Sequence, residues 1–354
     1  MSLSESPQKR DVSLDVIKGF LIALVVYVHC LEVGNGGAYQ SSRVYMDYPV
    51  YKFIYGFFMP SFMLISGYLF GRRLDRTDGK GMLPQLLWSY LLPVFCWSLL
   101  GFGWHVAFGG YKWLSLTRLA FDYYYFSITF VWYFTAILFA ALITIAARRL
   151  GRFGIVIALA VIPLLFIIPD TVIIPQVKYL YVYFIAGYYG RNHFVFAKKP
   201  KLPRYAVTAV CLAVYLILLR LWSIETYIYN GGFAVKNGQL AAVVVNNSIR
   251  WAAGFAGSGF VISLVRWILS FEKIKDANIT SSVASLGQQS LYVYIISSLV
   301  LTPILAKLTR GFGFRHITAV WETVIVLAVS IAGAWFSKRV RVVNLLFFGR
   351  KGKP

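Results

Sequence analysis

The chain has 354 residues, of which 59% are hydrophobic and only 14% are charged, and its formal net charge is +22. A soluble domain carries about 25% charged residues, so this composition excludes an ordinary soluble protein and indicates an integral membrane protein. The first apolar run, residues 12–33, is long enough to span a bilayer. No small-residue cleavage site follows it, so we do not expect a cleaved signal peptide.

Runs of about 17 to 22 mostly apolar residues recur along the chain, separated by polar or charged segments. They predict an all-α fold: a polytopic membrane bundle of about ten transmembrane helices that forms one membrane domain, residues 1–354. The predicted spans are residues 12–33, 50–70, 84–104, 129–147, 153–169, 174–190, 205–222, 249–269, 289–307 and 318–337.

Basic residues are distributed unevenly between alternate loops. Most of the 35 Lys and Arg residues fall on the side that also holds both chain ends. The positive-inside rule therefore predicts a cytoplasmic N-terminus, residues 1–11, and a basic cytoplasmic tail, residues 338–354. Topology and attraction to membrane lipids then explain the basic excess, so no nucleic-acid partner is expected. The longer outer segments, residues 34–49, 105–128 and 223–248, are rich in aromatic and amide residues, which suit either a carbohydrate or an interfacial aromatic belt.

The first span contains four ionisable residues. Each costs about 2.5–3.5 kcal/mol on insertion scales, so each is a candidate for function. Asp15 and Lys18 are three residues apart and are expected to pair near the cytoplasmic end. His29 follows Lys18 by close to three helical turns, which puts both on one side of the helix about 16 Å apart. His29 is a candidate catalytic base, with Glu32 as its orienting carboxylate, unless His29 simply bonds another helix.

Other kinds of site find little support. The remaining histidines lie in different connecting segments, and no H-x-x-x-H or E-x-x-H pair occurs, so no metal site is expected. No G-x-S-x-G motif marks a serine nucleophile. The three cysteines lie in apolar runs and are expected to be small core residues: Cys30, Cys96 and Cys211.

Four short stretches stand in a defined order along the chain: "LDVIKGFLIALVVYVH" (14–29), "FFMPSFMLISGYLFGRR" (57–73), "VWYFTAILF" (131–139) and "SLGQQSLYVYIISSLV" (285–300). In this order they resemble the motifs of the acyltransferase-3 family of membrane acyltransferases. The first stretch is most similar to the fucose 4-O-acetylase-like and exopolysaccharide O-acetyltransferase branch. Together with the ten predicted spans, the resemblance covers the whole chain.

The resemblance implies an O-acyltransferase of the bacterial inner membrane. Such an enzyme transfers an acyl group, usually acetyl from acetyl-CoA, to a sugar hydroxyl, and it holds no bound cofactor. The expected partners are an acyl-CoA donor and a carbohydrate or lipid-linked oligosaccharide acceptor. His29 matches the family's essential histidine. The residues that match acyl-donor positions are Lys18, Ser66, Gly67, Arg72, Arg73 and Tyr294.

Two positions depart from the family pattern. Lys18 stands where many members have Arg, which keeps the charge but loses the bidentate fork. Ser297 stands where many members carry a second histidine, so a role for that histidine does not transfer to this chain. Two of the matches also have a simpler explanation. Ser66 and Gly67 would suit close helix packing, and Arg72 and Arg73 would suit the positive-inside rule.

A transporter or flippase of a lipid-linked glycan is the alternative from another functional class. Many spans, charges within them and aromatic outer segments suit a transporter equally well. That alternative does not explain the four ordered stretches. Dependence on acetyl-CoA distinguishes the two, because a flippase would ignore this donor.

Overall fold

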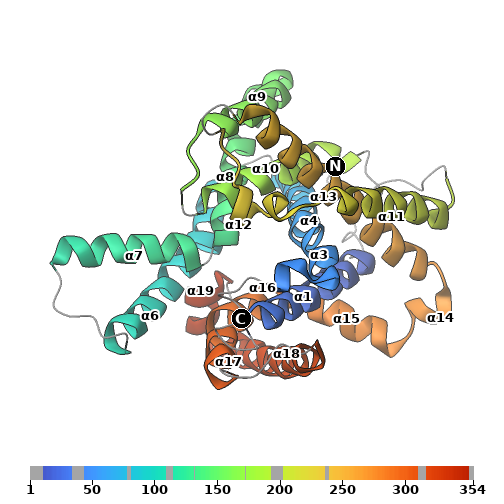
Figure 1. Ribbon diagram of the computed structural model, residues 1–354. Helices are drawn as coiled ribbons and strands as arrows, with labels where there is room; N and C mark the ends of the chain where they lie inside the picture. Colours follow the sequence, from blue (N-terminus) through green and yellow to red (C-terminus); the bar gives the residue numbers. More distant parts are fainter. Residues whose placement is uncertain are drawn as a thin grey trace, which may run out of the picture.

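The computed structural model describes residues 11–33, 44–77, 81–108, 115–130, 132–171, 173–192, 202–235, 239–309 and 316–350. Every regular element in these ranges is helical, as the composition predicts (Figure 1). In chain order the elements are α1 (Val12–Val33), η1 (Val44–Asp47), α3 (Pro49–Tyr55), α4 (Phe58–Thr77), α5 (Met82–Leu86), η2 (Leu87–Leu91), α6 (Leu92–Phe108), α7 (Leu116–Phe130), α8 (Trp132–Arg149), η3 (Gly151–Phe153), α9 (Gly154–Ile167), α10 (Ile174–Tyr189), η4 (Gly190–Asn192), α11 (Arg204–Arg220), η5 (Ile224–Thr226), α12 (Ile228–Gly231), α13 (Leu240–Ile268), α14 (Glu272–Lys275), α15 (Asn278–Gln288), α16 (Ser290–Ile295), η6 (Ile296–Leu301), α17 (Thr302–Leu308), α18 (His316–Arg339) and α19 (Arg341–Phe348).

Six helical segments of the described chain are long and apolar enough to cross a membrane, which supports an integral membrane protein. Each coincides with a predicted span. They are Val12–Glu32, Pro49–Thr77, Met82–Gly103, Trp132–Arg149, Leu240–Ile268 and Ile317–Arg339.

The other four predicted spans are helical but shorter or interrupted. Three of them form α9, α10 and α11, with 14, 16 and 17 residues. The fourth, residues 289–307, is divided by the π-helical turn η6 into α16 and α17. Length and apolarity therefore support six of the ten predicted spans.

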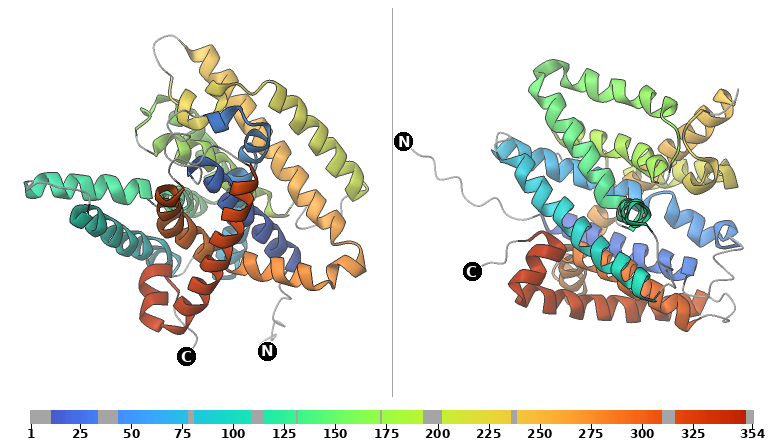
Figure 2. Two further views of the ribbon diagram at one scale, coloured as in Figure 1. Left: turned by 60° about the horizontal axis from the view of Figure 1, so that its bottom comes forward. Right: turned by 90° about the vertical axis from the view of Figure 1, so that its left-hand side faces the viewer.

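Several of the predicted connecting segments are partly helical. α7 occupies much of residues 105–128, α13 begins at Leu240, well before the predicted span, and α15 lies within residues 270–288. Arg118 and Asp122 form an i,i+4 ion pair of 3.1 Å on α7, which supports a helix that a search for apolar runs overlooks. In Figure 1 and in the left view of Figure 2, α6 and α7 lie together and extend away from the rest of the bundle.

Glycine allows the central helices to approach closely. A Cβ atom on Gly67 of α4 would lie 2.0 Å from the carbonyl oxygen of Phe184 on α10. A Cβ atom on Gly187 of α10 would lie 2.0 Å from the carbonyl oxygen of Leu64 on α4. Neither helix tolerates a side chain at this contact, so the two glycines fix α4 against α10. A similar pair joins α1 to α15: Gly19 and Gly287.

Ion pairs join several helix ends on one side of the bundle, which we call the basic face. Asp75 near the end of α4 accepts hydrogen bonds from Arg148 at the end of α8, at 3.0 Å, and from Arg191 just after α10, at 2.7 Å. Arg266 near the end of α13 lies 3.3 Å from Asp11, just before α1. These are helix ends that the alternating loop charges place on a single side.

Candidate active site

The last turns of α1 hold a histidine and a carboxylate in contact. His29 Nδ1 lies 3.0 Å from Glu32 Oε2, and the Tyr51 hydroxyl donates to Glu32 Oε1 at 2.7 Å. The His29 side chain is 31% exposed and that of Glu32 is 20% exposed, whereas Tyr51 of α3 is fully buried. The tautomer with its proton on Nδ1 can donate to a carboxylate here and leaves Nε2 able to take a proton. This is the arrangement that general base catalysis requires.

His29 and Glu32 line a small cavity of about 40 Å³. Its remaining walls come from α1, α3, α4, α8, α10, α12 and α16, so segments distant in the sequence enclose the histidine. The other lining residues are Val25, Tyr55, Phe58, Met59, Trp132, Gln176, Tyr179, Leu180, Ile228, Tyr229 and Tyr294.

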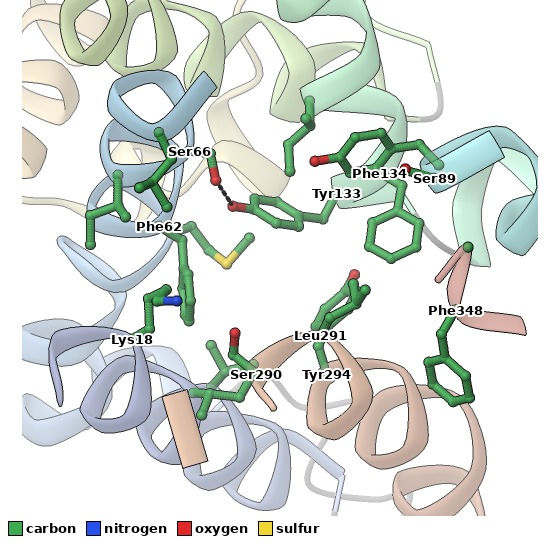
Figure 3. Close-up of a pocket in the computed structure, with 18 of the residues that line it drawn as sticks. Lys18, Phe62, Ser66, Ser89, Tyr133, Phe134, Ser290, Leu291, Tyr294 and Phe348 are labelled. Carbon is green, nitrogen blue, oxygen red and sulfur yellow. Dashed lines mark hydrogen bonds between the residues drawn. The ribbon is translucent and has the colours of Figure 1, made fainter. Parts of the chain in front are cut away.

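Figure 3 shows a second, larger cavity of the described structure, whose volume is about 320 Å³. Three cations line it: Lys18 of α1, Arg73 of α4 and Arg350, which follows α19. Val25, Met59 and Tyr294 line both cavities, so the two spaces adjoin. The histidine therefore lines one of two adjoining cavities, and the three basic side chains line the other.

The predicted pair on α1 forms, with Lys18 Nζ 2.8 Å from Asp15 Oδ1. Figure 3 shows the Lys18 amine and the hydroxyl groups of Ser66 and Ser290 around the same space. The Ser66 hydroxyl also lies 3.3 Å from that of Tyr133 on α8. The larger cavity thus combines apolar walls with a few polar groups, as small-molecule sites do.

Two of the residues predicted to bind the donor, Gly67 and Arg72, line neither cavity, so the structure does not bring them to the candidate site. Gly67 faces α10 at the backbone of Phe184, where it serves helix packing. Arg72 Nη1 donates to the Tyr68 hydroxyl at 3.0 Å, and its guanidinium lies over the Tyr68 ring. By contrast, four predicted donor residues line the larger cavity: Lys18, Ser66, Arg73 and Tyr294.

Ser297, at the position where a second histidine is common, is fully buried at the start of η6. Its hydroxyl donates to the Tyr294 carbonyl oxygen at 3.2 Å. Ser297 is not among the residues that line the two cavities, so its contact supports the turn that carries Tyr294.

Several lining residues were not singled out from the sequence. Arg350 belongs to the basic tail, whose positive charge the positive-inside rule explains without a binding role. Tyr133 lies inside the third motif, where both of its sequence neighbours are aromatic. Gln176 and Tyr179 lie in an apolar run, where an amide three residues from a tyrosine is the one signal that was available. Tyr229 lies in a connecting segment whose position depends entirely on the fold.

Buried polar contacts hold that connecting segment, residues 223–235, over the small cavity. Arg250 of α13 is fully buried, and its guanidinium donates to the carbonyl oxygens of Thr226 at 2.7 Å and Gly232 at 3.0 Å. Asp170, between α9 and α10, accepts from the Ala234 amide at 2.7 Å and lies 2.8 Å from Lys178 Nζ. We call residues 223–235 the cap.

The charge on Asp170 is stabilised in the fold. Burial alone would raise the pKa of this carboxyl, but the Lys178 ammonium and the backbone amides of Phe233 and Ala234 outweigh burial. The pKa of Asp170 is therefore held below its usual 3.8. The ionised carboxylate ties the cap to the start of α10.

Among the described residues, no group of three or more His, Cys, Asp or Glu side chains is placed to hold a metal ion. The three cysteines form no disulfide, and Cys30 is buried. The chemistry available at the site is therefore that of the His29–Glu32 pair, the hydroxyl groups and the cations described above.

Comparison with known proteins identifies the chain. A model described as "Acyltransferase domain" (Acyl_transf_3) matches residues 11–339. The chain is 27% identical over 352 residues to Nodulation protein NolL of Sinorhizobium fredii (strain NBRC 101917 / NGR234), covering 97% of this chain and 90% of that protein. It is 28% identical over 310 residues to Nodulation protein NolL of Mesorhizobium japonicum (strain LMG 29417 / CECT 9101 / MAFF 303099), covering 82% of this chain and 76% of that protein. No solved structure matches. The chain belongs to the acyltransferase-3 family and is an O-acyltransferase of the membrane.

Proposed function

We propose that this protein transfers acetyl from acetyl-CoA to a sugar hydroxyl of a cell-surface polysaccharide or exopolysaccharide, or of its lipid-linked precursor. The observation that carries the proposal is the pair of adjoining cavities on α1. One holds a histidine paired with a carboxylate, and the other holds three cations. A long anionic thioester and a neutral hydroxyl acceptor are the substrates that fit these two ends.

The larger cavity is the proposed donor site. Lys18, Arg73 and Arg350 provide positive charge for the phosphates of CoA, and the space between them and Tyr294 admits the acyl-bearing arm. About 320 Å³ is too little for the whole of CoA, so the nucleotide remains near the basic face. Lys18 and His29 are separated by about 16 Å along α1, so only an extended arm brings the thioester to the base.

His29 acts as the general base. Its Nε2 takes the proton of the acceptor hydroxyl while that oxygen attacks the acetyl carbonyl carbon. The tetrahedral intermediate collapses with cleavage of the C–S bond, and the CoA thiolate takes the proton back from His29. Glu32 holds Nδ1–H and balances the positive charge of the imidazolium, and Tyr51 fixes Glu32 in place.

The proposed topology has ten crossing helices in one domain, with both termini and the basic face in the cytoplasm of a bacterial inner membrane. Ion pairs at Asp75 and Asp11 gather the ends of α4, α8, α10 and α13 with the start of α1, which supports this orientation. His29 then lies nearer the outer side. The donor would enter from the cytoplasm and the acceptor from the opposite face.

A donor-dependence assay tests the proposed function. The purified protein in lipid nanodiscs is incubated with acetyl-CoA and, in turn, methyl glycosides of fucose, galactose, glucose and N-acetylglucosamine. We expect release of CoA thiol and gain of one acetyl group by at least one glycoside, detected by mass spectrometry. Arg73→Ala should raise the KM for acetyl-CoA.

Arg72→Ala is the matched control, because Arg72 is adjacent to Arg73 on the same helix. Its side chain contacts Tyr68 and does not line either cavity. Equal effects of the two substitutions would contradict the donor site. Absence of acetyl transfer to any glycoside and to polysaccharide from cells would contradict the proposed reaction.

A further inference from the structure

Two polar side chains of α10 line the His29 cavity. Gln176 and Tyr179 are three residues apart, so they share one face of the helix. Both line the small cavity with His29 and Glu32, and neither is among the residues that line the larger, cation-bearing one. They are only 7% and 3% exposed.

Gln176 Oε1 and the Tyr179 hydroxyl are buried and have no partner at hydrogen-bond distance within the described part of the protein. The Tyr183 hydroxyl is close enough to influence that of Tyr179 electrostatically, and the Gln176 side chain does the same to the Tyr229 hydroxyl. Neighbouring tyrosines of the same helix do have such a partner: Tyr181 donates to the Ala158 carbonyl oxygen at 2.9 Å, and Tyr183 to that of Arg250 at 3.2 Å. Buried polar atoms are almost always paired, and these two border a cavity, so an occupant of the cavity can complete their hydrogen bonds.

The chemistry of Gln176 distinguishes between the two substrates. A carboxamide oxygen can only accept a hydrogen bond, so its partner must be a donor. The acetyl thioester has no donor at its reacting end, whereas every sugar hydroxyl is one. The free oxygen of Gln176 therefore matches the acceptor, and the Tyr179 hydroxyl can pair with a hydroxyl in either direction.

The cap also contributes to the lining of the small cavity. Tyr229 of α12 lines it, and Gln176 lies beside the Tyr229 hydroxyl. Buried contacts of Arg250 and Asp170 fix the cap from two sides, so Tyr229 does not need to be ordered by the ligand. The space of about 40 Å³ has room for about three water-sized groups, which is enough for hydroxyl groups but not for a whole sugar ring.

We propose that Gln176 and Tyr179 form the acceptor-binding subsite of this enzyme, where they hydrogen-bond the reacting end of a polyhydroxylated acceptor beside His29. This inference rests on the proposed function and extends it. The two residues choose which hydroxyl reaches His29 Nε2, while Lys18 and Arg73 hold the donor.

Kinetics with each substrate varied in turn tests the subsite. The wild type, Gln176→Met and Tyr179→Phe are assayed in nanodiscs with acetyl-CoA and the best methyl glycoside of the panel above. Loss of one neutral hydrogen bond should raise the KM for the glycoside about 3- to 10-fold and leave the KM for acetyl-CoA unchanged. Each variant should lower the unfolding temperature less than the Tyr181→Phe control does, because Gln176 Oε1 and the Tyr179 hydroxyl have no partner at hydrogen-bond distance.

Tyr181→Phe is the matched control, since it removes one hydroxyl from the same helix at a site that lines neither cavity. It should lower the unfolding temperature and leave the glycoside KM unchanged. If the wild type acetylates the glycoside and both Gln176→Met and Tyr179→Phe keep the wild-type KM for it, the proposed acceptor-binding subsite is overturned. A rise in the KM for acetyl-CoA alone would also overturn it, and a wild type without acetyl transfer would overturn the proposed function itself.

Discussion

Replacement of Glu32 by Gln isolates the charge of the carboxylate that faces His29. Gln has nearly the same shape and retains an oxygen that can accept from Nδ1–H. It cannot balance the positive charge that His29 acquires when it takes the acceptor proton. The substitution should therefore lower kcat and leave the KM for acetyl-CoA unchanged, because Glu32 is not among the residues that line the larger cavity, the proposed donor site.

The geometry sets the size of this effect. His29 Nδ1 and Glu32 Oε2 are 3.0 Å apart, so the centres of the two charges lie about 4 Å apart. Unit charges at that distance attract by about 4 kcal/mol at an effective dielectric constant of about 20. Both side chains are partly exposed, which weakens the interaction to about 3 kcal/mol. Because 1.36 kcal/mol corresponds to a factor of ten in rate, kcat should fall about 100-fold.

The assay is acetyl transfer to the best methyl glycoside at saturating acetyl-CoA, with protein abundance measured in the same membranes. Glu322→Gln on α18 is the control, because Glu322 is a buried carboxyl that lines neither cavity. It should keep the wild-type KM for both substrates and a kcat within a few-fold. A Glu32→Gln enzyme with wild-type kcat would refute the role of the carboxylate as partner of the base.

Further substitutions test the donor site and the fold. Lys18→Ala should raise the KM for acetyl-CoA at least about 10-fold in steady-state kinetics, since charge-assisted hydrogen bonds contribute about 1.5–3 kcal/mol, and Lys18→Arg should retain much of the affinity. Gly67→Ala should destabilise the protein by about 1–3 kcal/mol in chemical unfolding, because its Cβ would lie 2.0 Å from the Phe184 carbonyl oxygen; wild-type stability would contradict the α4–α10 contact. Asp170 has a lowered folded-state pKa, so its stabilisation is present above the ordinary pKa of 3.8 and is lost as the pH falls below that value. Thermal unfolding should show this loss at acidic pH in the wild type and not in Asp170→Asn, and identical pH profiles would contradict it.

The sequence predicted the helical class, six of the spans and the polar side of α1, because each depends on one local pattern. Apolar runs of sufficient length identify membrane helices whatever surrounds them. The spacing of Asp15, Lys18, His29 and Glu32 is set by helical geometry alone, and the Asp15–Lys18 and His29–Glu32 contacts form as that spacing predicts.

The rest of the site depends on contacts between distant segments, which no local pattern records. Arg350 reaches the larger cavity only because α19 folds back against α6. Gly67 and Arg72 belong to a motif that includes Ser66 and Arg73, yet they lie on other faces of α4. A linear motif states which residues occur together but not which of them face the cavity. α7 escaped prediction because an ion pair and aromatic contacts, instead of an apolar run, support it.

The most direct measurement of the central claim is acetyl transfer by His29→Ala beside the wild type and a vector control. Cell polysaccharide is examined by proton NMR for acetyl groups, and the nanodisc assay gives rates for the same proteins at equal abundance. If His29 is the general base, His29→Ala should lose about 10²- to 10⁴-fold in rate, and the acetyl signals should fall to those of the vector control. A His29→Ala protein that acetylates at the wild-type rate would show that His29 is structural and would contradict the mechanism.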